Sequence, residues 1–407
     1  MSLALRALLS SPHLQQLAHI YLVLFLALLF MFPMLRRVNR LVQHLPPFSI
    51  LSGPSSSSTP RSLFPAPLAA REMATESSKK ITDWVNPSDK SGEFKRQASV
   101  FRNWISREAE AEFPPEKDRY HLYVSYACPW AHRTLIARKL KGLEDIISYT
   151  SVHWHLGEKG WRFATPDEDI PGTNTTPDPI HSSYTHLRDI YFANEPNYTG
   201  RFTVPVLYDK KTKRIVSNES SEIIRMFYYE FDDLLPAQYQ KVDLFPPHLR
   251  EQIDTTNEWV YNDVNNGVYK SGFATTQEAY ERNVTTLFAS LDKIEKHLVD
   301  SRSTYFFGDS ITEADIRLFT TIVRFDPVYV QHFKCNIRDI RSGYPAIHTW
   351  LRKLYWDIPA FRETTQFEHI KKHYTKSHSQ INPFGITPVG PTPDILPKDG
   401  EVNAVKH

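Results

Sequence analysis

The chain has 407 residues, enough for two or three domains with a hydrophobic core of ordinary size. Its hydrophobic fraction of 41% and charged fraction of 23% are those of a soluble globular protein. A formal net charge of +2, without a basic stripe interleaved with aromatic residues, argues against a nucleic-acid partner.

The first 72 residues form a predicted leader that precedes the folded domains. Residues 1–71 contain no Asp or Glu and carry several arginines, which resembles a mitochondrial transit peptide. The apolar run from Ile20 to Leu35 resembles a signal anchor, but it is short for a bilayer span of roughly 17–25 residues. Translation from Met73 would give an ordinary soluble N-terminus, and residues 46–70 form a Pro/Ser linker. We expect a cytoplasmic protein, with mitochondrial import or anchoring through Ile20 to Leu35 as alternatives.

Residues 81–246 alternate between short strand-like and helix-like patterns, as an α/β domain does. The predicted strands are Arg119 to Tyr126, Ile146 to Val152, Thr203 to Tyr208 and Arg214 to Ser217, and the predicted helices are Pro129 to Leu140 and Glu219 to Tyr228. A long insertion, His153 to Ser182, precedes the middle helix. This order predicts a thioredoxin-like domain that ends in a β-hairpin and a helix.

Residues 248–375 have helical periodicity throughout. The segment Gln277 to Leu298 places its large apolar residues on one face. The segment Thr312 to Phe325 begins with a capping box, in which Thr312 is the N-cap and Asp315 the third helical residue. We therefore predict an all-α domain here, followed by a Pro/Gly-rich tail at 376–407 that is extended or disordered.

The chain has two cysteines, which cannot build a disulfide framework and suit a reducing compartment. Cys128 lies in Tyr126-Ala-Cys-Pro-Trp-Ala-His-Arg133, at the predicted junction of a strand and a helix. A thiol attacks only as thiolate, and its ordinary pKa of about 8.5 leaves it mostly protonated. Pro129 fits the first helical position, and the amides at that helix end favour an ionised sulfur. His132 and Arg133 would add positive potential, so we predict that Cys128 is a nucleophile.

Ala131 occupies the place where a dithiol oxidoreductase has its second cysteine. A mixed disulfide on Cys128 must therefore be released by an external thiol, and glutathione is the expected cosubstrate. Cys335 lies in the helical region and is expected to be structural, although a resolving role is the alternative.

Two further features fit a site for a tripeptide. Val204-Pro205 precedes the predicted hairpin, where a cis proline would leave the Val204 backbone free to pair with an extended ligand. Glu219-Ser220 opens the next helix, where a hydroxyl and backbone amides can receive a carboxylate. Singly these are common turn and helix-start patterns, but their order after a Cys-Pro helix favours a glutathione site.

Long strings along the chain match one known family. In the α/β half they are Ala-Cys-Pro-Trp-Ala-His-Arg133, Gly160-Trp-Arg-Phe163, Thr203-Val-Pro-Val-Leu207 and Asn218-Glu-Ser-Ser-Glu-Ile-Ile-Arg225. In the helical half they are Val264-Asn-Asn-Gly-Val-Tyr-Lys270, Thr312-Glu-Ala-Asp-Ile-Arg-Leu-Phe319, Arg324-Phe-Asp-Pro-Val-Tyr329 and His369-Ile-Lys-Lys-His-Tyr374. From about residue 94 to 391 the chain thus resembles the glutathionyl-hydroquinone reductases, the omega-like Xi class of glutathione transferases.

The resemblance implies a glutathione transferase fold, with a thioredoxin-like domain before an all-α domain, and a homodimer. It implies that Cys128 attacks the sulfur of a glutathionyl-hydroquinone, expels the hydroquinone and forms a disulfide that a second glutathione reduces. No bound cofactor is implied. By position, glutathione would be held by Trp161, Arg201, Val204, Glu219 and Ser220, and the hydroquinone by Tyr269, Tyr329 and Tyr374. Tyrosine suits an aryl substrate because it joins an aromatic wall to a hydroxyl donor.

Three other interpretations stay open at this point. An omega-like thiol transferase or dehydroascorbate reductase would use the same Cys128. A membrane or scaffold protein of the intracellular chloride-channel type would also have a single cysteine in a thioredoxin-like domain. A metal enzyme is the third, but His153-x-His155 and His369-x-x-x-His373 lack a convincing third ligand, so we predict no metal.

Overall fold

The computed structural model describes residues 90–398, so the predicted leader with the run Ile20 to Leu35 lies outside the described residues, as do residues 399–407. The first domain consists of β1 (Tyr120–Val124), α3 (Pro129–Leu140), β2 (Ser148–Ser151), β3 (Leu156–Gly157), β4 (Gly160–Trp161), α4 (Leu187–Asn194), β5 (Val206–Asp209), β6 (Arg214–Ser217) and α5 (Ser220–Tyr229). The predicted strands and helices are confirmed. β5 begins later than expected because Pro205 has no N–H to donate to the sheet.

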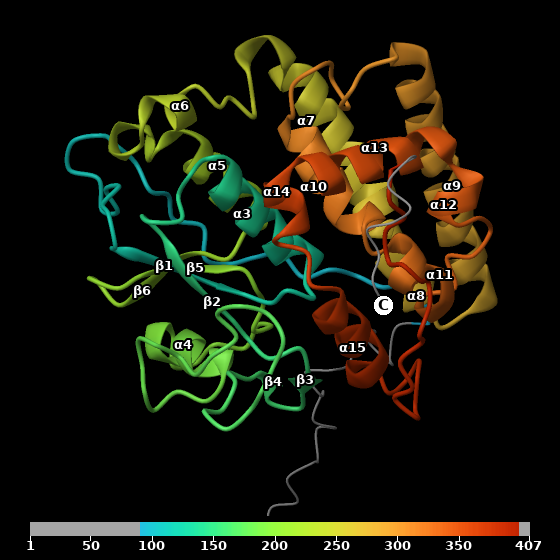
Figure 1. The fold of residues 1–407 in the computed structure, drawn as a ribbon. Coiled ribbons are helices and arrows are strands. Elements are labelled where there is room, and N and C mark those ends of the chain that lie inside the picture. The colour runs from blue at the N-terminus through green and yellow to red at the C-terminus, as the bar shows by residue number, and fades with distance from the viewer. Residues whose placement is uncertain (1–89, 399–407) are drawn as a thin grey trace, which may run out of the picture. The chain divides into compact units, whose positions relative to one another are not determined.

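Four strands of this domain form a sheet with the order β2-β1-β5-β6, and β3 and β4 pair as a separate two-stranded sheet. β1 pairs in parallel with β2 and antiparallel with β5, and β6 returns beside β5. Figure 1 shows α3 and α5 on one face of the sheet and α4 on the other. Covered on both faces, β1 is buried along its whole length. Even its polar residue, His121, is enclosed and hydrogen-bonds to Ser148 and Thr150, which gives the thioredoxin-like arrangement.

The second domain is helical. After the short α6 (Ala237–Gln240) come α7 (Arg250–Trp259), α8 (Gly267–Gly272), α9 (Gln277–Ser301), α10 (Glu313–Ile322), α11 (Val330–His332), α12 (Ile340–Gly343), α13 (Pro345–Asp357), α14 (Pro359–Arg362) and α15 (Phe367–Ser377). The predicted capping box is present, with Thr312 and Asp315 bonded reciprocally at the start of α10. α10 ends earlier than predicted, because a π-helical turn begins at Phe325.

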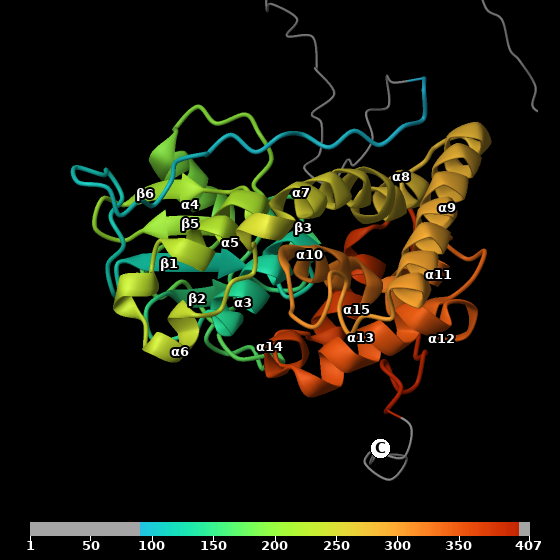
Figure 2. The ribbon, with the colours of Figure 1, turned by 90° about the horizontal axis from the view of Figure 1, so that it is seen from above.

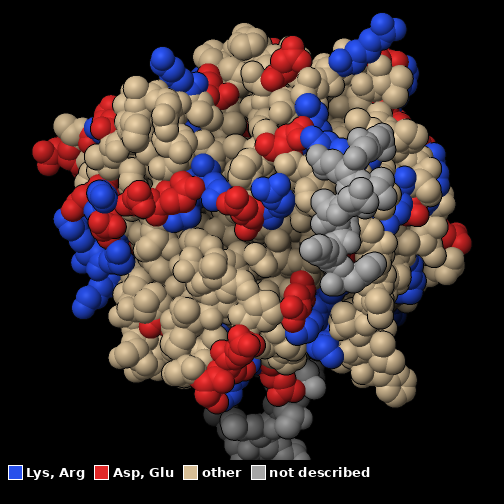
Figure 3. Space-filling model, in the orientation of Figure 1, with Lys and Arg blue, Asp and Glu red and all other residues tan. Residues whose placement is uncertain are grey.

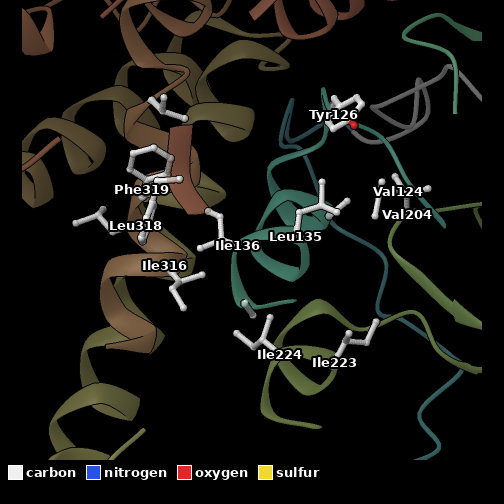
Figure 4. Close-up of a cluster of buried hydrophobic side chains, with 14 of the residues drawn as sticks. Val124, Tyr126, Leu135, Ile136, Val204, Ile223, Ile224, Ile316, Leu318 and Phe319 are labelled. Carbon is white, nitrogen blue, oxygen red and sulfur yellow. The ribbon is translucent and has the colours of Figure 1, made fainter. Parts of the chain in front are cut away.

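Helix α3 is the element that joins the two domains. Its apolar residues pack toward α5 on one side and toward α10 of the helical domain on the other, as Figure 4 shows. The labelled side chains in this cluster are Val124, Tyr126, Leu135, Ile136, Val204, Ile223, Ile224, Ile316, Leu318 and Phe319, and all are buried. The helix that carries the predicted nucleophile at its N-terminus is therefore fixed by both domains.

A segment before β1 also bridges the domains. Residues 91–103, called the N-terminal strap here, run across the ends of α8 and α7 toward β6 (Figure 2). At one end, the carbonyl of Gly92 accepts a hydrogen bond from the amide of Thr275 at 3.1 Å. At the other end, Phe101 and Asn218 exchange hydrogen bonds with each other. The strap is thus anchored to the helical domain at one end and to the thioredoxin-like domain at the other.

The helices and charged side chains of the described residues bear on the sequence predictions for a membrane span and for charge. Between residues 90 and 398, no helix is both long enough and apolar enough to cross a bilayer. On the face shown in Figure 3, charged side chains of both signs lie interspersed, as expected for a net charge of +2.

The tail after α15 lies along the helical domain, where its backbone carbonyls accept hydrogen bonds from Arg341, Arg352 and Trp356.

Candidate active site

A cavity between the thioredoxin-like domain and the helical domain collects most of the predicted site residues. Those that line it are Cys128, Trp161, Arg201, Val204, Tyr269 and Tyr374. Glu219 and Ser220 come directly after Asn218, which also lines the cavity. Tyr329 lies behind the wall and reaches the cavity only through Tyr374, to which its hydroxyl is hydrogen-bonded. Strings far apart in the sequence therefore converge on one space.

Cys128 is the N-cap residue of α3, with an extended backbone, and Pro129 is the first helical residue, as predicted. The sulfur lies 3.6 Å from the carbonyl oxygen of Val204, to which the thiol donates. The Val204–Pro205 peptide bond is cis, as the sequence analysis suggested. The backbone of Val204 thus lies beside the sulfur, where an extended ligand could pair with it.

The electrostatic surroundings of Cys128 correct one expectation. Burial raises the pKa of the thiol above its ordinary value, and this outweighs the opposing effects. Those opposing effects come from the backbone amides of Ala131 and Trp130, and from the guanidinium groups of Arg324 and Arg96. The helix end therefore acts in the predicted direction, but without substrate the thiol form prevails.

The charges that reach the sulfur are also not the predicted ones. Burial and the neighbouring Arg324 lower the pKa of His132 well below its ordinary value, so the ring is neutral. Its Nδ1 accepts a hydrogen bond from Arg324, and its Nε2 therefore donates to Thr364. Burial lowers the pKa of Arg133 to about 9, and its guanidinium points to Asn265 at 2.7 Å. His132 and Arg133 hold the domains together, whereas Arg324 and Arg96 act on Cys128.

Arg324 comes from the helical domain and is fully buried. It donates to the carbonyl oxygens of Tyr126 and Ala127, the two residues that precede Cys128, at 2.9 and 3.0 Å. Among the described residues no carboxylate pairs with it. The positive charge of Arg324 therefore lies beside the loop that carries the Cys128 sulfur. The sequence did not predict this contact because the two segments are far apart in the chain.

The predicted glutathione residues occupy the wall nearest the sheet. Trp161 stacks on His373, with ring centroids 4.8 Å apart. Glu219 is the N-cap of α5, and its carboxylate accepts hydrogen bonds from Ser221 and from Ser99 of the N-terminal strap. Burial alone would raise the pKa of this carboxyl, but those hydrogen bonds bring it below the ordinary value. Glu219 is thus ionised at neutral pH and can receive an ammonium group.

The three predicted tyrosines form one hydrogen-bonded cluster, although they come from α8, from the π-helical turn and from α15. The hydroxyl of Tyr374 lies 2.5 Å from that of Tyr269 and 3.0 Å from that of Tyr329. Burial is the main cause that raises the pKa of all three phenols, so each keeps its proton at neutral pH. Two of the three O–H groups are used inside the cluster, and the third is left as a phenolic donor for the cavity, which suits a ligand with aromatic oxygens.

Several residues of the cavity were missed by the sequence analysis. The N-terminal strap contributes Phe94, Arg96, Gln97, Ala98 and Ser99 to the lining. These residues precede the first strand and show neither periodicity nor a motif, so nothing in the sequence marked them. The helical domain adds His373 and His378 beside Tyr374.

The described part of the chain bears on two alternatives, a resolving role for Cys335 and a metal site. Cys335 is completely buried, its thiol donates to the carbonyl of Phe333, and burial raises its pKa well above the ordinary value. These surroundings fit packing rather than thiol chemistry. Within residues 90–398 no group of three His, Cys, Asp or Glu side chains is arranged to hold a metal ion.

A four-stranded thioredoxin-like sheet, an attached helical domain and a lone cysteine at the start of α3 define a glutathione transferase of the cysteine type. The comparisons with known proteins agree. Residues 127–228 match the glutathione S-transferase N-terminal domain, and residues 277–353 match the glutathione S-transferase C-terminal domain.

Relatives match over most of their own length. Glutathione S-transferase omega-like 2 of Schizosaccharomyces pombe is 57% identical over 316 residues, covering 77% of this chain and 97% of the relative. The glutathionyl-hydroquinone reductase YqjG of Escherichia coli is 49% identical over 318 residues, covering 77% and 93%. The Xi glutathione transferase ECM4 of Saccharomyces cerevisiae, solved in complex with glutathione, is 50% identical with a TM-score of 0.71, covering 74% of this chain and 100% of that one. The chain therefore belongs to the glutathione S-transferase family, in its Xi class.

Proposed function

We propose that this protein reduces glutathionyl-hydroquinones to hydroquinones with glutathione, through a disulfide between Cys128 and glutathione. The observation that carries the proposal is a single cavity in which a lone cysteine faces a cluster of tyrosine hydroxyls. A thiol without a resolving partner requires an external thiol, and an aromatic wall with hydroxyl donors requires an aromatic substrate that has oxygen atoms.

The reaction consists of two exchanges at sulfur. The Cys128 thiolate attacks the glutathione sulfur of the substrate, a sulfur–sulfur bond forms, and the bond between that sulfur and the aromatic carbon breaks. The hydroquinone leaves after it gains a proton. A second glutathione, as thiolate, then attacks the mixed disulfide and leaves as oxidised glutathione, so that Cys128 is regenerated.

The residues divide between the two halves of the substrate. Trp161, Arg201, Val204, Glu219 and Ser220 hold the tripeptide. In this assignment the Glu219 carboxylate receives the amino group, the start of α5 receives the neighbouring carboxylate, and the Val204 backbone pairs with the cysteinyl residue.

The tyrosine cluster binds the aromatic half. Tyr269 and Tyr374 contact the hydroquinone ring and its oxygens, while Tyr329 supports Tyr374 from behind. The O–H group that the cluster does not use internally also donates to the oxygen that gains negative charge when the carbon–sulfur bond breaks.

The test uses purified protein, glutathione and the hydroquinone form of glutathionyl-menadione. We expect free menadiol and oxidised glutathione in equal amounts, and mass spectrometry of enzyme quenched without excess glutathione should find one glutathione on Cys128. Cys128→Ser should abolish turnover, and Cys335→Ser is the matched control that keeps it. Turnover by Cys128→Ser would exclude the proposed nucleophile. Reduction of dehydroascorbate with none of the conjugate would favour an omega-like thiol transferase instead.

The assembly and the compartment form part of the proposal. We propose a homodimer, which light scattering of the purified protein tests. We propose a cytoplasmic location, with mitochondrial import or membrane anchoring as the alternatives that depend on residues 1–72. The N-terminus of the protein isolated from its source, determined by mass spectrometry, distinguishes these locations.

A further inference from the structure

The N-terminal strap lies outside both segments that match the transferase domains, yet it forms one wall of the cavity. It is held on both sides of that cavity, by Thr275 of the helical domain and by Asn218 of the thioredoxin-like domain. Arg96 lies between these anchors. A side chain supported in this way has a fixed position relative to Cys128, although it comes from an irregular segment.

The guanidinium of Arg96 is held by an amide and by aromatic rings. Its Nε donates to the Asn266 side-chain oxygen at 2.7 Å. Its central carbon lies 4.5 Å from the Trp130 ring centroid, 5.1 Å from that of Tyr269 and 5.4 Å from that of Phe94. These contacts set the plane of the guanidinium group, and the hydrogen bond to Asn266 does not use the N–H donors on its two terminal nitrogens.

One of those donors has no partner. The Nη2 atom of Arg96 is buried and makes no hydrogen bond within the described part of the chain. No carboxylate among residues 90–398 pairs with this guanidinium either. A buried N–H without an acceptor is costly, so such a group in a cavity wall points to a ligand that brings an acceptor.

The surroundings of Arg96 indicate which acceptor the ligand brings. Trp130 and Tyr269 both line the cavity, whereas the Glu219 carboxylate at the tripeptide end is bonded to Ser221 and Ser99. Burial raises the pKa of both Cys128 and Tyr269, and the charge of Arg96 opposes that rise in each, as expected for a guanidinium near both. Because the guanidinium lies on the rings of Trp130 and Tyr269, an oxygen of the aromatic ring fits this position better than a carboxylate of glutathione.

We propose that Arg96 is a catalytic residue that stabilises the oxygen of the departing aromatic ring. The proposal rests on the function proposed above. When Cys128 attacks the glutathione sulfur, the substrate reacts as the keto tautomer, with a hydrogen on the carbon that bears sulfur. The electron pair of the breaking carbon–sulfur bond enters the ring and displaces the carbonyl pair onto oxygen, giving a phenolate. Arg96 stabilises this phenolate by charge and by Nη2–H, and a proton from solvent completes the hydroquinone.

The test compares two substrates in which Cys128 attacks the same atom, the glutathione sulfur, but expels a different leaving group. One is the hydroquinone form of glutathionyl-menadione, and the other is the mixed disulfide of glutathione and 2-mercaptoethanol. The second expels a thiolate and needs no stabilised ring oxygen. Rates are compared at the alkaline plateau of each pH profile, because removal of Arg96 also alters the ionisation of Cys128.

We expect Arg96→Met to lower kcat for the conjugate about 100-fold or more, as the loss of a donor to an oxyanion does. The rate with the mixed disulfide should change less than about threefold at that plateau, where Cys128 is fully ionised. Arg96→Lys should fall between, because it keeps the charge but loses the planar fork. Lys95→Met, an exposed neighbour in the same strap, is the matched control.

Each alternative result has a definite meaning. Equal losses with both substrates would show that Arg96 acts only through Cys128 or through the fold, and would overturn the proposal. A raised KM for glutathione with kcat unchanged would assign Arg96 to the tripeptide and overturn it as well. Wild-type protein that reduces the mixed disulfide but not the conjugate would overturn the proposed function itself.

A binding measurement gives a readout without turnover. In Cys128→Ser protein, bound 4-nitrophenol should ionise at a lower pH when Arg96 is present than in the Cys128→Ser, Arg96→Met double variant. Equal ionisation of the bound phenol in both proteins would overturn the proposal.

Discussion

The tyrosine cluster allows a prediction from a count of hydrogens. Three hydroxyls supply three O–H donors, and their two mutual contacts, Tyr374 to Tyr269 and Tyr374 to Tyr329, use two of them. One donor is left for a ligand oxygen in the cavity. Tyr374→Phe removes the central hydroxyl, which breaks both contacts and the link that orients the remaining donor.

The size of the effect follows from the charge on the acceptor. A hydrogen bond to a charged oxygen contributes about 1.5–3 kcal/mol, and each 1.4 kcal/mol is about tenfold in rate. We therefore expect Tyr374→Phe to lower kcat/KM for a glutathionyl-hydroquinone about 10- to 150-fold. The two hydroxyls left unpaired, of which that of Tyr329 is fully buried, should also cost about 1–3 kcal/mol of stability each.

Tyr329→Phe is the matched control for this measurement. It removes a terminal hydroxyl that does not line the cavity, and the remaining pair still has one donor to spare. Its kcat/KM for the conjugate should stay within about threefold of wild type, since no donor to the ligand is lost. Both variants are assayed with the conjugate and with a glutathione mixed disulfide, below their unfolding temperatures. Equal losses in the two variants, or none in Tyr374→Phe, would refute the count of donors.

Two further predictions concern ionisation. Because burial raises the pKa of Cys128, its alkylation by iodoacetamide in free enzyme should rise about tenfold per pH unit from pH 6 to 9, and a plateau below pH 8 would contradict this. Burial lowers the pKa of His373 to about 3. Its titration therefore leaves stability unchanged above the unfolded pKa of about 6.5 and opposes folding increasingly as pH falls from there toward 3. At pH 5 this costs about 2 kcal/mol, and urea unfolding of His373→Asn should show a smaller loss than wild type between pH 7 and 5.

What the sequence predicted well depends on local signals. The helix Pro129–Leu140 has the expected bounds, because Pro129 fixes its first turn. The capping box of Thr312 and Asp315 likewise placed the start of α10. Signals of this kind operate within a few residues, and sequence reasoning can use them without knowledge of the tertiary structure.

The features of the site that could not be predicted from the sequence depend on tertiary contacts. The strap that carries Arg96 has no periodicity, and its place in the cavity is set by hydrogen bonds to Thr275 and Asn218, which are far away in the sequence. The balance of effects on Cys128 depends on burial by the helical domain, which no local pattern reports. The helix end was foreseen correctly, but its influence could not be weighed against desolvation.

The position of Arg324 gives the helical domain a direct part in the chemistry of the sulfur. This buried cation bonds to the carbonyls of Tyr126 and Ala127, and to the neutral ring of His132 one turn into α3. If the domains were separated, those carbonyls would lose their donor, and Cys128 would lose a charge that lowers its pKa. The same contacts fix the start of α3 relative to the tyrosine cluster, because Arg324 directly precedes the π-helical turn that ends at Tyr329. Orientation of the thiol, its ionisation and its alignment with the aromatic wall are therefore coupled through one side chain.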